Sequence, residues 1–268
     1  MRPRRIDLGE HMAGDMRTPP WLSAGGSINE HGPGLLMRGW LVIELLLLFV
    51  GLPLALKHAV HIERMPLFMV LQPVLLAFVV FLLWDRWFLL RRELVKGFGV
   101  MDLLSILAIF AIAGGMVAVY MAQEMPERFL AFPRQRYETY ERVMILYPLV
   151  SVLTQELVYR TFFFHRYGPL FGTWRWPMIL TNGMLFGFAH IVFDNHVAII
   201  GTGLVGTLLA YRYATTRSFW AVFIEHTLWG WLVFTVGLNK YFFTGISNMP
   251  AWDRMNEWIE IIERQLGI

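Results

Sequence analysis

The chain has 268 residues, of which 56% are hydrophobic and 16% are charged, and its mean hydropathy is +0.50. Soluble domains have about 45 to 50% apolar and about 25% charged residues, so this composition indicates an integral membrane protein. The absence of cysteine excludes disulfides, thiol nucleophiles and thiolate metal ligands. The net charge of +3 does not indicate a nucleic-acid partner, because the basic residues stand mainly at the ends of apolar segments.

Successive apolar segments predict an all-α, polytopic membrane helix bundle with about seven transmembrane helices. The predicted spans are residues 39–56, 65–84, 100–121, 143–164, 176–190, 196–213 and 219–238. Glu44, Gln72 and Asp102 interrupt the first three. We expect Asp102 to reach the interface, and we expect Glu44, which lies deeper, to snorkel or to be paired near the start of its helix rather than to lie at a functional site.

The sequence divides into four regions. Residues 1–34 form a basic tail without the apolar run of a signal peptide, and we expect it to be mobile and cytoplasmic. Residues 35–142 hold the N-terminal helices and an interfacial loop, 143–238 hold the remaining transmembrane helices, and 239–268 form an amphipathic interfacial helix. The excess of lysine and arginine on the side of the N-terminus predicts a cytoplasmic N-terminus, and we expect the protein in a bacterial inner (plasma) membrane.

The fourth span carries the two charges around which the chain is organised. Glu156 and Arg160 are the only formally charged residues between 143 and 164. They are four residues apart, so in a helix they lie on one face and can pair. An unpaired charge at the bilayer centre costs at least about 2.5 to 3.5 kcal/mol, so this pair either holds helices together or takes part in chemistry.

Two histidines in later spans join Glu156 as candidate functional groups. His190 ends the fifth span, and His226 lies inside the seventh. Either histidine alone is most simply a packed, hydrogen-bonded residue, but three helices that each bring one titratable group to a similar depth indicate a functional site. Small residues at four-residue spacing, Gly183 with Gly187 and Gly206 with Ala210, predict close packing of these helices. We expect His165 and His196 at the interface.

These groups permit two chemistries that their spacing does not separate. In one, Glu156 and His190 draw a proton from a water that attacks a carbonyl, while His226 donates to the developing oxyanion. In the other, Glu156, His190 and His226 bind zinc, which activates the water. Both give peptide hydrolysis. We expect no tightly bound metal or other cofactor, because Arg160 competes for the carboxylate and repels a cation.

At these residues the sequence resembles the CPBP family of intramembrane proteases, which includes CAAX prenyl endopeptidases and bacteriocin-processing and immunity proteins. The family motifs Glu-Glu-x-x-x-Arg, Phe-x-x-x-His and His-x-x-x-Asn/Asp correspond to residues 155–160, 186–190 and 226–230. The resemblance covers about Leu149 to Val233. It implies a glutamate-dependent, water-mediated endopeptidase that acts within the membrane and has long been described as a metalloprotease.

Two positions depart from the family pattern. The first glutamate, to which the family assigns activation of the water, is Gln155, which cannot take up a proton at neutral pH. The Asn/Asp of the third motif is Gly230, for which Glu225 is a candidate replacement. Either Glu156 acts as the base in place of Gln155, or the chain is a non-catalytic relative that binds membrane partners.

The sequence thus predicts an intramembrane endopeptidase. Its expected substrate is a membrane-associated or C-terminally anchored protein, or a lipid-modified peptide, and its other expected partners are membrane lipids. Its candidate catalytic residues are Gln155, Glu156, Arg160, His190 and His226. A proton-coupled transporter that uses Glu156 and both histidines as a relay is a further alternative, although no internal repeat typical of transporters is evident.

Overall fold

The structure is a computed structural model that describes residues 34–61, 67–84, 94, 96–242 and 264. The predicted basic tail, apart from Gly34, lies outside this part of the chain, and so does the predicted C-terminal interfacial helix, apart from residues 239–242 and Arg264.

The described residues form helices and no strand, which confirms the all-α class. The helical elements are α2 (Leu35–Leu46), η2 (Leu47–Gly51), α3 (Leu52–His61), α4 (Leu67–Trp84), α6 (Val100–Ile109), η3 (Phe110–Gly114), α7 (Gly115–Glu124), α8 (Ala131–Gln135), α9 (Tyr137–Leu146), η4 (Tyr147–Val152), α10 (Leu153–Glu156), η5 (Leu157–Phe162), α11 (Phe163–Phe171), α12 (Arg175–Ala189), η6 (His190–Phe193), α13 (His196–Thr216), α14 (Phe219–Val236) and η7 (Leu238–Phe242). Several run on without a break, so that α2 to α3, α6 to α7 and α9 to α11 each form one long helix.

Five helical stretches in the described part of the chain are long and apolar enough to cross a membrane. They are Leu35–His58, Val100–Glu124, Arg175–Phe193, His196–Thr216 and Phe219–Val236, and Gln72–Trp84 is a shorter apolar helix. The long helix that carries Glu156 and Arg160 is not one of the five. The protein is thus an integral membrane helix bundle, while the count of seven spans stays a prediction.

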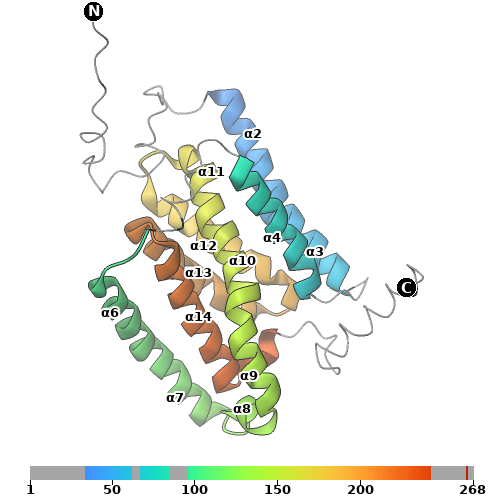
Figure 1. Cartoon of the computed structure of the whole chain (residues 1–268), viewed down its shortest axis with the longest axis vertical. Coiled ribbons are helices and arrows are strands. Elements are labelled where there is room, and N and C mark those ends of the chain that lie inside the picture. Colours follow the sequence, from blue (N-terminus) through green and yellow to red (C-terminus); the bar gives the residue numbers. More distant parts are fainter. Residues whose placement is uncertain (1–33, 62–66, 85–93, 95, 243–263, 265–268) are drawn as a thin grey trace, which may run out of the picture.

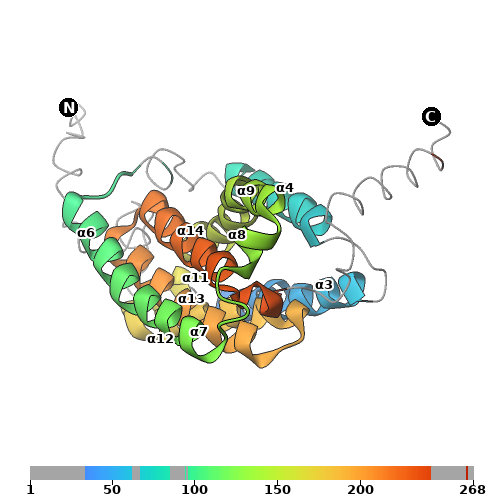
Figure 2. The ribbon, with the colours of Figure 1, turned by 90° about the horizontal axis from the view of Figure 1, so that it is seen from below.

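The helix from α9 to α11 runs through the bundle (Figure 1). The α2–α3 helix and α4 lie on one side of the bundle, and the α6–α7 helix lies on the opposite side, as the perpendicular view also shows (Figure 2). This arrangement buries Glu156 and Arg160 completely. It also leaves large apolar side chains of the outer helices exposed, as lipid-facing residues must be.

Glycines bring α12 and α13 close together, which confirms the predicted packing of small residues. A Cβ atom added at Gly183 would lie 2.8 Å from Cα of Thr207, and one added at Gly187 would lie 2.8 Å from Cα of Gly203. These distances are shorter than any ordinary carbon contact, so only glycine lets the two backbones approach this far. Phe186, between the two glycines in sequence, is thereby held against Gly206.

The first helix is anchored to the central helix by an ion pair and by aromatic rings. Glu44 accepts hydrogen bonds from Nε and a terminal nitrogen of Arg166 at 2.8 and 2.7 Å, and from the hydroxyl of Tyr167 at 3.1 Å. One turn further along, the ring of Phe49 packs edge to face against Tyr159, with 5.1 Å between ring centres. Glu44 is therefore a paired structural residue, as expected from the sequence.

The predicted interfacial loop contains the short helix α8 between α7 and α9. Leu130, with φ +59°, precedes α8, and α9 begins at Tyr137 and continues directly into the central helix. The central helix is thus longer than the predicted span 143–164. Gly237 ends α14 with φ +92° against the backbone carbonyl of Arg128, so it both takes a left-handed conformation and allows a close approach.

Candidate active site

The motif residues of the central helix lie between two π-helical turns. Helix α10, which holds Gln155 and Glu156, is flanked by η4 and η5. Such wide turns often mark functional sites, because they change the direction in which the following side chains point. Pro148, inside η4, has no N–H to give to the carbonyl of Met144, and the indole N–H of Trp231 donates to that carbonyl at 2.9 Å.

Glu156 is fully buried and is shared between a histidine and an arginine. Its Oε1 lies 2.7 Å from Nδ1 of His226, and its Oε2 lies 3.2 Å from Nε of Arg160. A carboxylate can only accept, so Nδ1 of His226 carries the hydrogen of the first contact. Oε1 is therefore hydrogen-bonded, whereas Oε2 contacts the guanidinium as an ion pair without a hydrogen bond.

Arg160 is held by two further helices. A terminal nitrogen donates to Oδ1 of Asn182 at 2.8 Å, and Nδ2 of Asn182 donates to the carbonyl of Tyr159 at 2.6 Å. The guanidinium carbon also lies 4.8 Å from the ring centre of Phe186. The ion pair predicted from the four-residue spacing is present, and its hydrogen bonds make it an anchor between the central helix, α12 and α13.

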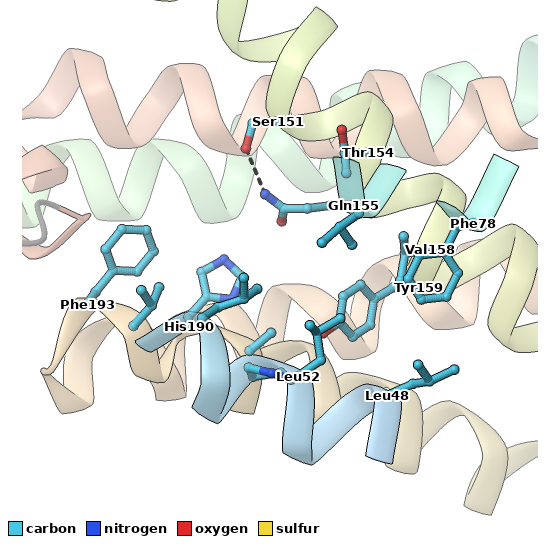
Figure 3. A pocket seen from close by; sticks show the side chains of 15 residues that line it. Leu48, Leu52, Phe78, Ser151, Thr154, Gln155, Val158, Tyr159, His190 and Phe193 are labelled. Carbon is cyan, nitrogen blue, oxygen red and sulfur yellow. Dashed lines mark hydrogen bonds between the residues drawn. The ribbon is translucent and has the colours of Figure 1, made fainter. Parts of the chain in front are cut away.

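His190, at the end of α12, faces a cavity of about 110 Å³. Its Nδ1 lies 2.8 Å from the carbonyl of Phe186. A carbonyl only accepts, so Nδ1 carries the hydrogen and Nε2 of the neutral ring is a free acceptor. The cavity is mostly apolar; its lining includes Leu48, Leu52, Val74, Phe78, Ser151, Thr154, Gln155, Val158 and Phe193 (Figure 3).

Gln155 faces the same cavity. Its Nε2 donates to Oγ of Ser151 at 2.7 Å, while its Oε1 is buried without a hydrogen-bond partner. In Figure 3 the amide of Gln155 and the ring of His190 stand on opposite sides of the cavity. The cavity therefore brings together two acceptors, Oε1 of Gln155 and Nε2 of His190, that both require a donor. A volume of this size has room for water, since a cavity needs only about 10 to 15 Å³ to hold one water molecule.

The five sequence-predicted site residues fall into two linked groups. Gln155 and His190 line the cavity, whereas Glu156, Arg160 and His226 form a buried cluster beside it that does not line it. Adjacent helix residues point about 100° apart, which is why Gln155 and Glu156 enter different groups. The ring of Phe186 joins the groups, since its centre lies 4.9 Å from that of His190 and 5.5 Å from that of His226.

The donors of the proposed zinc site do not come together. Among the described residues no three His, Asp or Glu side chains are placed to hold a metal ion. Glu156 already contacts a histidine and a guanidinium, whose positive charge opposes a cation at the same oxygen. The residues therefore do not fit a zinc ion bound by Glu156, His190 and His226.

Glu225 does not lie at the site either. Its oxygens accept from Nε and a terminal nitrogen of Arg212 at 2.8 and 3.3 Å, and Arg212 also donates to Oγ of Ser105 at 2.6 Å. This buried ion pair joins α14 to α13 and α6. Glu225 thus faces away from His226, and it does not replace the Asn/Asp of the third motif.

Two further residues of the site were not singled out in the sequence. Asn182 supports Arg160, and the hydroxyl of Tyr147 lies 3.2 Å from Nε2 of His226. Asn182 precedes Phe186 and His190 at four-residue spacing within an apolar helix, and this pattern was available from the sequence. Tyr147 lies 79 residues before its partner, so nothing in the local sequence indicates the contact.

Residues 140–232 match the family model of the type II CAAX prenyl endopeptidase Rce1-like family. This part of the chain is a CPBP-family domain. The match spans the central helix from within α9 through α12 and α13 to most of α14, and so contains every residue of the two groups described above. No curated protein and no solved structure matched the chain. Residues 140–232 are thus similar to a family of membrane-embedded proteases.

Proposed function

We propose that this protein is an intramembrane endopeptidase in which His190 deprotonates a water and Gln155 orients it. One observation carries the proposal: inside a CPBP domain, the unsatisfied amide oxygen of Gln155 and the ring of His190, whose Nδ1 is bonded to a backbone carbonyl, face one small cavity. A water between them would donate one hydrogen to each. An amide oxygen can orient an attacking water without taking its proton, as glutamine does in some phosphoryl-transfer enzymes.

In this mechanism the proton moves through His190. As the water oxygen attacks the carbonyl carbon of the peptide, Nε2 of His190 takes its proton and the carbonyl oxygen becomes an oxyanion. The same nitrogen then gives the proton to the leaving amine, the C–N bond breaks, and the products are a carboxylic acid and an amine. Gln155 holds the water on the line of attack and stays neutral throughout.

The proposed general base is therefore His190 and not Glu156, which was the candidate favoured by the sequence. Glu156 is committed to His226 and Arg160, and it does not reach the cavity. In the proposed mechanism its role is to hold the charge of Arg160 and the ring of His226, so that Phe186 and His190 keep their places.

We further propose a substrate that enters from the membrane. Leu48, Leu52, Val74 and Phe78 line the cavity beside the polar groups, and they suit the apolar side chains of a membrane-associated or C-terminally anchored peptide. We also propose that the protein lies in a bacterial inner membrane with a cytoplasmic N-terminus. Its proposed substrate is a membrane protein or a lipid-modified peptide.

The test compares single variants in a cell-based assay of C-terminally tagged membrane proteins, with expression level as the folding control. His190→Ala should reduce cleavage to background. Gln155→Glu should raise cleavage, because a carboxylate in the same place is a stronger base and general-base catalysis contributes about 10²- to 10⁴-fold. Cleavage that persists in His190→Ala would contradict the assignment of the base.

A second candidate function, a non-catalytic CPBP relative that binds membrane partners, is favoured by one observation. The position that carries the family's base holds an amide, and the neighbouring carboxylate is locked in a buried pair. In that case wild type and His190→Ala should be equally inactive, and Gln155→Glu should gain cleavage. This result would overturn the hydrolase proposal.

A further inference from the structure

Gly230 leaves a space on α14 that the ring of Tyr147 fills. A Cβ atom added at Gly230 would overlap the phenol ring, with its nearest atoms all belonging to Tyr147. Position 230 is where the third CPBP motif has Asn or Asp. The Tyr147 ring in its present place and a side chain at position 230 are thus mutually exclusive in this structure.

The phenol reaches the histidine of the same motif. The hydroxyl of Tyr147 lies 3.2 Å from Nε2 of His226, whose Nδ1 lies 2.7 Å from Glu156. In the tautomer that carries its hydrogen on Nδ1, Nε2 is the acceptor and the phenol is the donor. A continuous chain of polar contacts therefore runs from Arg160 through Glu156 and His226 to Tyr147.

The place of Tyr147 is fixed by the way in which α9 and η4 run along α14. The hydroxyls of Tyr140 and Thr235 lie 2.9 Å apart, and Trp231 donates to the carbonyl of Met144 at 2.9 Å. These contacts precede Tyr147 along the central helix and follow position 230 along α14, as expected for antiparallel neighbours. The ring of Phe234 packs edge to face against Tyr147, with 5.2 Å between ring centres.

We propose that Tyr147 is a positioning residue that replaces the Asn/Asp of the third motif by fixing the ring and tautomer of His226. The inference rests on the proposed function for its catalytic consequence, but the contact itself can be measured without any substrate. The effect on the reaction passes through His226 and Phe186, which stands between the two histidines.

The first test reads the contact directly, in protein labelled with ¹⁵N-histidine and held in lipid nanodiscs. The His226 resonances are identified by their loss in His226→Gln. Tyr147→Phe should shift the Nε2 resonance of His226. Tyr140→Phe is the matched control, because it removes a phenol hydroxyl from the same helix that bonds Thr235 instead. An unshifted His226 signal in Tyr147→Phe would overturn the proposal.

The second test replaces the contact made by Tyr147 with an asparagine at position 230, the residue type of the family motif. Gly230→Asn alone should lower the melting temperature, because the new side chain overlaps the Tyr147 ring. Tyr147→Ala with Gly230→Asn should melt higher than Gly230→Asn and should return the His226 signal toward its position in wild type. If the double variant melts no higher than Gly230→Asn, the two positions are not the coupled pair that we propose.

The third test concerns turnover. Tyr147→Phe should lower kcat at least about tenfold and leave KM unchanged, since a misplaced group costs rate rather than binding. The double variant Tyr147→Ala with Gly230→Asn should have a kcat between that of Tyr147→Phe and that of wild type. Full turnover in Tyr147→Phe would overturn the positioning role. If wild type cleaves nothing, the proposed function fails, while the ¹⁵N shift and the melting temperatures still decide whether Tyr147 holds His226.

Discussion

Gln155 and Glu156 are neighbours in the chain that have opposite environments. The amide of Gln155 ends in a cavity with an unsatisfied oxygen, whereas the carboxylate of Glu156 ends in a dry contact with Arg160 and His226. The turn of a helix by about 100° per residue separates them. The charged side chain of Glu156 therefore belongs to the buried cluster with Arg160 and His226. The neutral side chain of Gln155 lines the cavity together with His190.

A first prediction concerns the buried pair. Glu156→Gln leaves the guanidinium of Arg160 buried without its carboxylate, and loss of one partner of a buried pair costs about 3 to 5 kcal/mol. We expect a clearly lower melting temperature in detergent. Replacing both partners, as in Glu156→Gln with Arg160→Met, should cost less than Glu156→Gln alone, because no unpaired charge remains.

The control for this prediction is Glu127→Gln. Glu127 pairs with Arg128 at 3.5 Å, but its side chain is 68% exposed, and exposed pairs contribute about 0 to 1 kcal/mol. Its melting temperature should stay close to that of wild type. Equal melting of Glu156→Gln and Glu127→Gln would show that the buried pair is not an anchor of the fold.

At the scale of helices, the contact between α12 and α13 sets the position of His190. Gly183 and Gly187 let the two backbones meet, and Phe186 and His190 extend from the same helix toward the central helix. The end of α12 then tightens into η6 at His190. A shift of α13 relative to α12 would move both the histidine and the ring that joins it to His226.

We therefore expect Gly183→Ala to destabilise the protein by about 1 to 3 kcal/mol, the usual cost of overpacking a tight contact. The added methyl group would meet the backbone of Thr207, which cannot rotate away. Gly201→Ala is the matched control on α13, because a Cβ there meets nothing within 4 Å. Thermal melting of both variants in detergent measures the difference, and equal melting would contradict the packing argument.

At the scale of the whole molecule, the polar groups lie in the middle of a bundle whose outer surface is apolar. The long helix that bears them is enclosed by α2 to α4 on one side and by α6 to α7 and α14 on the other (Figures 1 and 2). Burying the charges in protein rather than in lipid is what allows an ion pair at this depth. The central helix should therefore cross the membrane although its own hydropathy is lower than that of its neighbours.

Single-cysteine labelling tests this topology, since the sequence has no cysteine of its own. With a cytoplasmic N-terminus and seven spans, Trp174→Cys in the turn before α12 should be cytoplasmic, and Glu127→Cys in the turn after α7 should be external. A membrane-impermeant maleimide should label only Glu127→Cys in intact bacterial cells, and both variants after permeabilisation. Labelling of both from the same side would show that the central helix does not cross.

The sequence by itself determined the class of the protein and the residues of its motifs. Composition and the length of the apolar segments predicted a membrane helix bundle, because lipid requires backbone groups to be satisfied within each helix. The spacing of Glu156 with Arg160 predicted their pair, and the glycine spacing predicted the contact of α12 with α13. These features depend on residues a few positions apart in one helix, so the helical period decides them.

Only the tertiary structure decided which groups meet in the cavity. The direction of Gln155 toward His190, the commitment of Glu225 to Arg212, and the insertion of Tyr147 beside Gly230 all depend on how separate helices are rotated and how closely they approach. Helical periodicity places a side chain on a face, but the partner of that face is set by packing over the whole bundle. For this reason the base that we propose is His190 rather than Glu156, and the contact of Tyr147 with His226 could be recognised only in three dimensions.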